Sequence, residues 1–455
     1  MFDWDILYFA TIKLMSKDKN NAFPEGFLWG ASTSSYQVEG GNHNQWSLWE
    51  EQHATGLAAS ALARQHWLPV WEEIKDQAQD PNNYISANAV EHYQRYEEDF
   101  NIAKKLNLNT LRFGVEWSRI EPEQGQWNKA AIEHYKQYIA DLKKRGIQPV
   151  INLWHWTLPV WFNKKGGFIH RSNVKHFVRF VEHIAKEIIV PCGYVITVNE
   201  PNSYTGMGYL QGVWPPQKHD PIAGVQVVYN LAVAHRRIYK LLKKLEPTLQ
   251  IGVATQCNNN RPERAHNPLD KLMAGLANYF WNWWFLNRVM RCQDFVGFNY
   301  YFTDYFKGVV RKNPKTHHHH VHTGHRGPIR KSRENPPGPL SDLGWYMEPS
   351  GIYHVIVEAA KRYKKPIIIT ETGVADIHDR YRKWWIKENL EAIERANQEG
   401  ANVIGYFHWS LLDNFEWSTG WWPKFGLVAV DREHDMKRTI KPSGKWYAQQ
   451  IKKLS

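Results

Sequence analysis

The chain has 455 residues, of which 43% are hydrophobic and 22% are charged, and its formal net charge is +12. This length and composition exclude a disordered or fibrous chain and allow one large core, because β/α barrels often exceed the usual domain size as single units. The basic balance would suit nucleic acid or an anionic membrane. The basic residues are spread along the sequence, however, without a basic helix or a nucleic-acid-binding motif, so we expect neither a nucleic-acid nor a membrane partner.

Short apolar runs, many of them β-branched, recur along the chain and predict eight strands. Amphipathic segments separate these runs, and residues 97–105 and 130–145, for example, carry apolar side chains at helical spacing. This alternation of strands and helices predicts an α/β protein with a single-domain (β/α)8 TIM barrel. The predicted strands are residues 27–33, 109–115, 148–155, 194–199, 250–256, 294–299, 366–370 and 402–409.

The N-terminal residues differ in pattern from the rest of the chain. Residues 1–15 contain an apolar stretch, but acidic residues occupy the place of a basic leader region, and the run is too short to span a bilayer. We therefore expect no export signal and a cytoplasmic protein. Residues 1–20 are interpreted as an N-terminal extension and residues 21–455 as the barrel domain.

Two longer segments interrupt the alternation. Residues 54–78, after the first predicted strand, are rich in alanine with apolar spacing, and they predict helix that helps to cover the cleft. Residues 307–339, after the sixth predicted strand, are rich in Lys, Arg, His and Pro and predict a long loop.

The chain contains one histidine-rich stretch and three cysteines, residue types that can form metal or disulfide sites. The histidine-rich stretch at residues 317–325 could bind zinc, nickel or copper. Consecutive histidines in a loop impose no fixed coordination geometry, so we expect no functional metal and no cofactor. Cys192, Cys257 and Cys292 are odd in number and lack CxxC or zinc-ligand spacing, which argues against a disulfide framework.

Two glutamates lie in matching contexts. Glu200 in TVNEP and Glu371 in ITETG each follow a short β-branched run and precede a turn residue. In a parallel barrel the chemistry sits at the C-terminal ends of the strands, where both glutamates fall. A single strand-end glutamate is usually a solvated loop residue or a helix-start carboxylate, whereas two together favour cleavage of a glycosidic bond.

Glycosidic cleavage needs its two carboxyl groups in different protonation states. One protonates the leaving oxygen while the other meets the positive charge at the anomeric carbon. Two like charges held close together push their pKa values apart, which supplies this difference. When the nucleophile becomes an ester its charge disappears, so the pKa of the acid should fall and the same group can then act as base for water.

Around these glutamates the chain resembles glycoside hydrolase family 1, the family of retaining β-glucosidases and β-galactosidases. The resemblance runs almost from end to end in seven ordered motifs, and the 23 tryptophans of the chain suit stacking on sugar rings. It implies a barrel that acts on a small-molecule β-glycoside or oligosaccharide. The motifs are FPEGFLWGASTSSYQVEG (23–40), HYQRYEEDFNIAKKLNLNTLRFGVEWSRIEP (92–122), NLWHWTLP (152–159), TVNEP (197–201), DFVGFNYY (294–301), ITETG (369–373) and GYFHWSLLDNFEWSTGW (405–421).

The resemblance also implies catalytic roles. It makes Glu200 the acid/base and Glu371 the nucleophile, with Asn199 holding the sugar 2-hydroxyl. Arg112 of the RF motif and Tyr301 of the NYY motif become hydrogen-bond donors to the nucleophile, since a guanidinium beside a carboxylate keeps it ionised. Taken alone, Arg112 would suit a barrel-end ion pair and Tyr301 ordinary core packing.

For the nonreducing sugar, the resemblance implies a set of hydroxyl-binding side chains. Their chemical types can accept from or donate to neighbouring hydroxyls, although His155 taken singly is more often a core histidine. Trp409 would be the stacking platform, and Trp345 would line the aglycone entrance. The hydroxyl-binding residues are Gln37, His155, Asn199, Glu416 and Trp417.

Glu416 also bears on the choice of substrate. Family members that cleave 6-phosphoglycosides usually have a small residue there, with a lysine and a tyrosine downstream that hold the phosphate. Here a carboxylate would repel phosphate, Phe425 stands where that tyrosine would be, and Lys424 is interpreted as a surface charge. The resemblance therefore implies neutral sugars. Thr372 and Thr157 stand where the family more often has asparagine and aspartate.

The sequence thus predicts a retaining exo-β-glycosidase that hydrolyses unphosphorylated β-glucosides, β-galactosides or both by a two-glutamate mechanism. Two alternatives stay open. A transglycosidase would have the same residues and differ in whether water or another sugar intercepts the intermediate. A carbohydrate-binding relative would keep the barrel and the aromatic residues but typically lose one glutamate.

Overall fold

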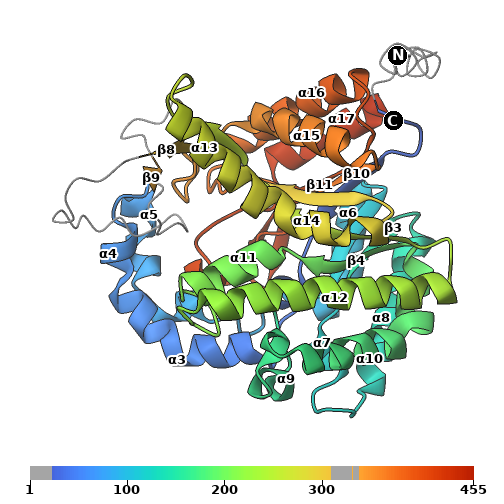
Figure 1. Cartoon of the computed structure of the whole chain (residues 1–455). Helices are drawn as coiled ribbons and strands as arrows, with labels where there is room; N and C mark the ends of the chain where they lie inside the picture. The colour runs from blue at the N-terminus through green and yellow to red at the C-terminus, as the bar shows by residue number, and fades with distance from the viewer. Residues whose placement is uncertain (1–22, 309–329, 332–337) are drawn as a thin grey trace, which may run out of the picture.

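The computed structural model describes residues 23–308, 330–331 and 338–455, which form a closed parallel barrel surrounded by helices (Figure 1). Around the barrel the strands run β1-β11-β10-β7-β5-β4-β3-β2, which is chain order once the short strands elsewhere are set aside. The predicted (β/α)8 TIM barrel is confirmed, and each predicted strand matches one barrel strand. The barrel strands are β1 (Leu28–Ser32), β2 (Thr110–Gly114), β3 (Gln148–Asn152), β4 (Tyr194–Asn199), β5 (Gln250–Gln256), β7 (Val296–Tyr300), β10 (Ile367–Thr372) and β11 (Val403–Trp409).

Helices follow the barrel strands and cover the outside of the barrel. The outer helices are α6 (His92–Lys105), α8 (Lys129–Lys144), α10 (Val174–Ile184), α12 (Pro221–Leu245), α13 (Pro268–Ala277), α14 (Trp284–Val289), α15 (Ile352–Tyr363), α16 (Arg382–Gln398) and α17 (Pro442–Leu454). Apart from α13, which packs against the small sheet of β6 and β8, these helices turn an apolar face inward, as in α10, where Phe177, Val181 and Ile184 recur at helical spacing and are buried. The helices predicted at residues 97–105 and 130–145 correspond to parts of α6 and α8. Shorter helices lie at the strand ends: α2 (Ser35–Val38), α7 (Trp117–Ile120), α9 (Val160–Lys164) and α11 (Pro201–Thr205).

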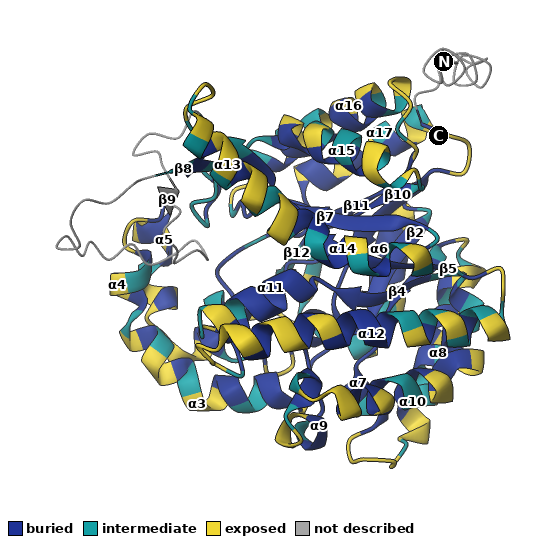
Figure 2. Ribbon diagram, viewed as in Figure 1, coloured by how far each residue is buried: buried dark blue, intermediate teal, exposed yellow. Residues whose placement is uncertain are grey.

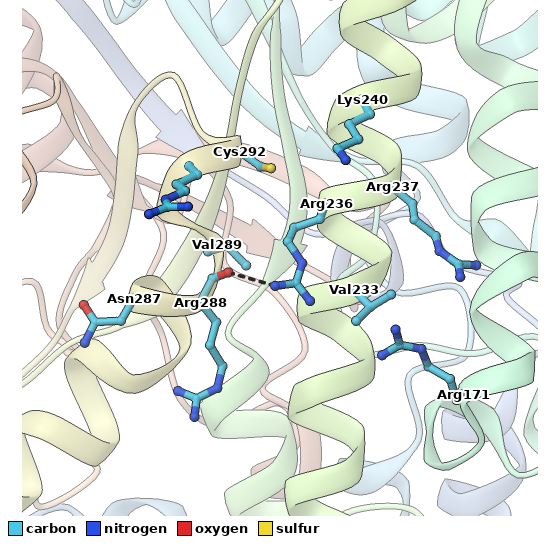
Figure 3. A pocket seen from close by; sticks show the side chains of 10 residues that line it. Arg171, Val233, Arg236, Arg237, Lys240, Asn287, Arg288, Val289 and Cys292 are labelled. Atoms are coloured by element: carbon cyan, nitrogen blue, oxygen red, sulfur yellow. Dashed lines mark hydrogen bonds between the residues drawn. The ribbon is translucent and has the colours of Figure 1, made fainter.

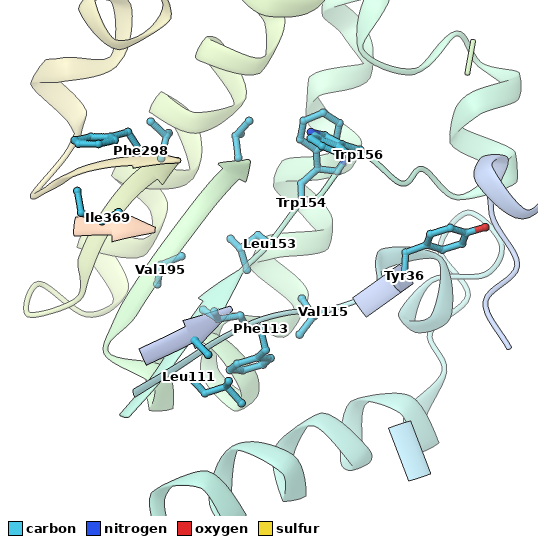
Figure 4. Packing of buried hydrophobic residues seen from close by; sticks show 14 of the residues in the cluster. Tyr36, Leu111, Phe113, Val115, Leu153, Trp154, Trp156, Val195, Phe298 and Ile369 are labelled. Atoms are coloured by element: carbon cyan, nitrogen blue, oxygen red, sulfur yellow. The ribbon is translucent and has the colours of Figure 1, made fainter. Parts of the chain in front are cut away.

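Side chains fill both the inside of the barrel and the layer between the barrel and the helices. Along β10, Ile368 packs inside with Phe407 of β11, whereas Ile369 joins the outer layer. The barrel strands are almost entirely buried, and the helices are exposed mainly on their outer faces (Figure 2). Figure 4 shows part of the outer layer, to which neighbouring strands contribute Leu111, Phe113, Val195, Phe298 and Ile369.

The strand pairing is irregular beside both strand ends that carry the glutamates. The β4–β5 pairing shifts register between Ile196 and Asn199, and the β10–β7 pairing shifts between Ile369 and Glu371. Such irregularities bend a strand and redirect the next side chain. Regular alternation would send Glu371 to the helix side with Ile367 and Ile369, so the shift accounts for its turn into the mouth of the barrel.

A helical segment covers the C-terminal end of the barrel. Helix is confirmed within residues 54–78, but it is divided among three helices, α3 (Gln45–Ala59), α4 (Ala61–Gln65) and α5 (Trp71–Ala78). Trp71 and Ile74 of α5 pack in one cluster with Leu343, Ile377 and Trp422. Because those three partners come from the loops after β7, β10 and β11, the segment lies over the strand ends.

Two small sheets lie outside the barrel. One contains β6 (Asn259–Pro262), β8 (Thr303–Lys307) and β9 (Arg330–Lys331), and the other pairs β12 (Val428–Asp431) with β13 (Lys437–Ile440). Where residues 307–339, predicted as a loop, are described by the structure, they include the short strand β9. Residues 1–22, 309–329 and 332–337 lie outside the described residues, so the N-terminal extension, the domain boundary and the role of the histidine-rich stretch stay predictions.

The three cysteines are all free, and Cys192 and Cys257 are buried. Burial raises the pKa of the Cys192 thiol well above its usual value, and that thiol donates to Ile188 O (3.2 Å). Within the described part of the chain, no helix is long and apolar enough to cross a membrane. In the same residues, no group of three or more His, Cys, Asp or Glu side chains is placed to hold a metal ion.

Replacing Phe407 with alanine should destabilise the barrel interior. Phe407 is fully buried, and its ring lies 2.7 Å from where a Cβ on Gly30 of β1 would stand. Phe407→Ala should lower the free energy of unfolding by about 3–5 kcal/mol, because it leaves a cavity that the closed barrel fills poorly. Leu62→Ala is the control, since Leu62 is 56% exposed and its loss should change stability by less than about 0.5 kcal/mol. Equal shifts in melting temperature for the two variants would contradict this packing.

Candidate active site

Glu371, at the end of β10, is held by two donors from other strands. It is 4% exposed and forms an ion pair with Arg112 of β2, which is fully buried. Tyr301, just after β7, donates its hydroxyl to the second carboxylate oxygen of Glu371 (2.7 Å). A guanidinium and a phenol on the two oxygens are the partners that an ionised carboxylate requires. The structure therefore brings Arg112 and Tyr301 onto Glu371, as the sequence analysis expected.

Glu200, directly after β4, is buried, and no cation among the described residues forms an ion pair with it. Asn299 donates its amide to Glu200 Oε1 (2.6 Å), and the backbone N–H of Glu200 donates to Ala254 O (2.7 Å). Burial, together with the nearby Glu371 charge, raises the pKa of Glu200 to about 8. At neutral pH this carboxyl group therefore carries a proton, whereas Glu371 has the partners of an anion.

Asn299 is a site residue that the sequence analysis missed. Its amide nitrogen also lies 3.2 Å from Asn199 Oδ1, and its own oxygen accepts from the Thr370 hydroxyl (2.6 Å). It thereby joins the ends of β4, β7 and β10. The signal was present, because Asn299 ends a predicted strand within the DFVGFNYY motif.

Three residues at the mouth of the barrel have left-handed backbone conformations. Their φ angles are 42° at Glu200, 73° at Trp156 and 48° at Trp417. For residues other than glycine such backbone costs about 1–3 kcal/mol and persists where the surroundings fix it, commonly at functional sites. Glu200 and Trp417 are candidate site residues and Trp156 adjoins His155, so at these three positions the strain coincides with the candidate site.

Gln37 and Glu416 form a polar edge beside the two glutamates. The Gln37 amide nitrogen donates to Phe415 O (2.7 Å) and Asn414 Oδ1 (3.0 Å), and it lies 3.5 Å from Glu416 Oε2. Burial, with the charges of Glu371 and Glu200, raises the pKa of Glu416 to about 8. Glu416 can therefore both donate and accept hydrogen bonds at neutral pH.

His155 and Asn199 are hydrogen-bonded in the buried floor of the site. Asn199 Nδ2 lies 3.1 Å from His155 Nε2, and Arg112 Nη2 donates to Asn199 Oδ1 (2.6 Å). Asn152 Nδ2 lies 3.2 Å from the other ring nitrogen of His155. Burial and the nearby Arg112 charge lower the pKa of His155 well below its usual value. The imidazole is therefore neutral.

Aromatic rings form two walls around these polar groups. On one side, Trp345 lies 5.9 Å from Tyr301 and 6.2 Å from Phe425 between ring centroids, and Trp409 packs in the same cluster. On the other side, Trp417 lies 5.9 Å from His155 and stacks near-parallel to it. All the site residues that the sequence analysis named are thus linked by contacts at one end of the barrel.

Trp156 is a second residue that the sequence analysis missed, although it adjoins His155 in NLWHWTLP. Its ring lies 4.7 Å from that of Trp417 between centroids. Its buried indole N–H has no acceptor among the described residues. Buried donors are nearly always hydrogen-bonded. The Trp156 N–H lies beside the residues that the resemblance assigns to sugar hydroxyls, so a sugar hydroxyl could accept its hydrogen bond.

The two threonines that depart from the family pattern have defined partners. The Thr372 hydroxyl accepts from the indole N–H of Trp385 on α16 (3.0 Å), which anchors the end of β10 beside Glu371. The Thr157 hydroxyl donates to the buried carboxylate of Glu116 (3.0 Å). Both substitutions therefore keep the local hydrogen bonding satisfied.

The expectation for Lys424 was wrong. This lysine is half-buried rather than a surface charge, and its ammonium donates to Trp421 O (2.8 Å). Burial lowers the pKa of Lys424. Lys424 lies in the loop after β11, and its carbonyl accepts from the Asp376 N–H (2.9 Å) and from Arg382 (2.9 Å) in the segment after β10. The sequence alone did not indicate this packing.

Comparison with known proteins agrees with this geometry. The sequence matches Glycosyl hydrolase family 1 over residues 19–294 and 288–454. Beta-glucosidase A of Thermotoga maritima is 30% identical over 472 residues, covering 94% of this chain and 98% of that protein. Beta-glucosidase A of Acetivibrio thermocellus is 29% identical over 485 residues, with the same coverage of 94% and 98%.

Solved structures of β-glycosidases are also similar to this chain. A β-glycosidase from Pyrococcus horikoshii superposes with a TM-score of 0.78 at 30% identity, covering 95% of each chain. A family 1 β-glucosidase from Thermotoga maritima gives a TM-score of 0.81 at 27% identity, covering 95% of this chain and 99% of that one. The chain therefore belongs to glycosyl hydrolase family 1, and it is a glycoside hydrolase.

Proposed function

We propose that this protein is a retaining exo-β-glycosidase that hydrolyses unphosphorylated β-glucosides, β-galactosides or both. The observation that carries the proposal is the unequal setting of two buried carboxyl groups. Glu371 has a guanidinium and a phenol as partners, while Glu200 has a pKa raised to about 8. This is the division into nucleophile and acid that a double displacement requires.

In the first half-reaction Glu371 attacks the anomeric carbon while Glu200 gives its proton to the leaving oxygen. The products of this step are the free aglycone and a glycosyl ester on Glu371. Asn199, which is held by Arg112 (2.6 Å), offers its amide to the sugar 2-hydroxyl. A hydrogen bond there strengthens as positive charge develops on the ring, so it lowers the barrier more than it tightens binding.

In the second half-reaction Glu200 acts as a base. Forming the ester removes the negative charge of Glu371, which is one of the causes that raise the pKa of Glu200. The pKa of Glu200 therefore falls, and the ionised carboxylate can take a proton from the attacking water. The sugar leaves with its β configuration, because the two displacements each invert the anomeric centre.

Neutral sugars are favoured by the charge balance of the site. Glu200 and Glu371 are buried and Glu416 lies half-buried beside them, and Arg112 forms an ion pair with Glu371. A phosphate on the sugar would add negative charge to this set. The edge formed by Gln37 and Glu416, with the indole N–H of Trp156, which has no acceptor in the described part of the chain, suits uncharged hydroxyls instead.

Removing each glutamate in turn should give opposite stereochemistry with azide. In Glu371→Ala, azide takes the place of the nucleophile and attacks the anomeric carbon on the α face, opposite the leaving group. A p-nitrophenyl β-glucoside should therefore yield the α-glycosyl azide. In Glu200→Ala, Glu371 still forms the ester and azide displaces it, which should yield the β-glycosyl azide. Each variant should lose at least about a thousandfold in hydrolysis of unactivated substrates. NMR of the azide products checks the assignment.

The matched control is Glu433→Ala, which removes an exposed carboxylate from the loop between β12 and β13 and should hydrolyse at the wild-type rate. The role assignment fails if Glu371→Ala keeps near wild-type hydrolysis, or if the two azide anomers are exchanged.

The raised pKa of Glu200 predicts the alkaline limb of the activity profile. For an alkyl β-glucoside, whose leaving group needs the acid, kcat/KM should fall as pH rises through about 8, where Glu200 loses its proton. The Asn299 hydrogen bond favours the ionised form and so lowers this pKa. Asn299→Ala should therefore move the alkaline limb to higher pH. Gln398→Ala, an exposed amide on α16, should leave the limb in place, and a shift to lower pH in Asn299→Ala would refute the assigned contact.

Glu416 should exclude phosphorylated sugars. Above about pH 8, where Glu416 is ionised, Glu416→Ser should raise the rate ratio of 6-phospho-β-glucoside to β-glucoside by at least about tenfold, since it removes a negative charge that repels the phosphate. Glu416→Gln keeps the size of the side chain but cannot ionise, so comparing it with the wild type above about pH 8 separates charge repulsion from steric exclusion. If both variants keep the wild-type ratio, Glu416 does not set this selectivity.

A further inference from the structure

A basic groove lies on the outside of the barrel between α12 and the segment formed by α14 and η8 (Met290–Cys292). It encloses about 800 Å³, and its lining includes six cationic side chains and no acidic one (Figure 3). Because η8 comes just before β7, this end of the groove lies at the opposite end of the barrel from the glutamates. The cationic residues are Arg171, Arg236, Arg237, Lys240, Arg288 and Arg291.

The cations gather here although they are dispersed in the sequence. Val233, Arg236, Arg237 and Lys240 follow the spacing of one face of α12. The last turns of α12 are in fact basic, which corrects the expectation that the chain has no basic helix. Acidic residues are absent from positions 221–245 and 271–293, the two stretches that contain the groove residues of α12 and of the α14–η8 segment.

The charges of the groove are not neutralised by the protein. Lys243, on the same helix, pairs with Asp294 (2.8 Å). Among the described residues, by contrast, none of the six groove cations forms an ion pair with a carboxylate. Like charges three or four residues apart on a helix repel each other. Without a bound anion the groove is therefore electrostatically unfavourable, and an anion that binds there would reduce the repulsion.

Two of the guanidinium groups are already held in place. Arg236 donates to Arg288 O (3.3 Å), and Arg288 donates to Trp284 O (2.7 Å) while stacking 3.7 Å above the Trp284 ring. Figure 3 shows Arg236 directed across the groove toward Arg288. These partners are neutral, so the guanidinium groups keep their full charge and further N–H donors. Because these two side chains are already held in place, they lose less conformational entropy when a phosphate binds them in bidentate geometry.

We propose that this groove binds a small molecule that carries at least two phosphate groups. The phosphates would bridge the cations of α12 and those of the α14–η8 segment. A small ligand suits the volume, which lies in the usual range for small-molecule sites. The groove is also bounded: the Lys243–Asp294 pair lies near one end, and Arg171 lies over the Tyr229 ring (5.3 Å) at the other. A long nucleic acid would need a basic surface that continues further.

The test uses sodium tripolyphosphate as the probe on the full chain, at fixed ionic strength set with NaCl. Calorimetric titration should show one saturable site, and the melting temperature should rise with probe concentration. Arg237→Gln/Lys240→Gln removes two exposed cations of the groove and should weaken binding by about tenfold or more. Lys452→Gln/Lys453→Gln removes two exposed cations of α17 and changes the net charge equally, yet it should bind as the wild type does.

Three results would overturn the proposal. They are the absence of saturable binding by the wild type, equal weakening in both double variants, and binding of long polyanions such as heparin without binding of tripolyphosphate. Misfolding is checked in the absence of the probe, where Arg237→Gln/Lys240→Gln should melt no lower than the wild type because it removes repulsion. The binding measurement needs no glycosidase substrate, so its outcome is independent of the proposed catalytic function.

Discussion

The buried ion pair between Arg112 and Glu371 fixes the geometry on which the rest of the site depends. Arg112 is fully buried, and an unpaired charge there would be strongly destabilising. The same guanidinium donates to Asn199, so one side chain ties the ends of β2, β4 and β10 together. The two members of the pair are 259 positions apart in the sequence. They meet because barrel closure brings all the strand ends to one rim, and the register shift in β10 turns Glu371 toward that rim.

The second constraint is that the site holds few charges. Burial raises the pKa values of Glu200 and Glu416, and it lowers that of His155. The floor is therefore largely uncharged apart from the Arg112–Glu371 pair. This one electrostatic arrangement accounts for three proposed properties: a protonated acid at neutral pH, an ionised nucleophile, and a preference for neutral sugars. When Glu200 gives its proton to the leaving group, Glu200 becomes negatively charged. Ester formation removes the negative charge of Glu371 at the same time, so the net charge of the site does not change.

Much of this could be predicted from the sequence, because apolar runs, strand-end polar residues and motif order are local signals. Every barrel strand and both glutamates were found in that way. The contacts of Asn299 and Trp156 were missed, since they join strands that are distant in sequence. Lys424 was misjudged because its loop packs against the segment after β10, through Asp376 and Arg382, and that contact is not local in the sequence. The basic groove was overlooked for the same reason: Arg171, the α12 cations and Arg288 look dispersed until the helices pack. Local patterns give the elements, whereas side-chain partners depend on the closure of the barrel.

The most direct test of the central claim is NMR on the first-formed sugar anomer, recorded before mutarotation, during hydrolysis of a panel of unphosphorylated β-glycosides. The account predicts turnover of the β-glucoside, the β-galactoside or both, with the β-anomer released first, because two displacements at one carbon restore its configuration. Release of the α-anomer first would mean direct attack by water, and Glu371 would then not be a nucleophile. That result would contradict the role assigned to the Arg112–Glu371 pair.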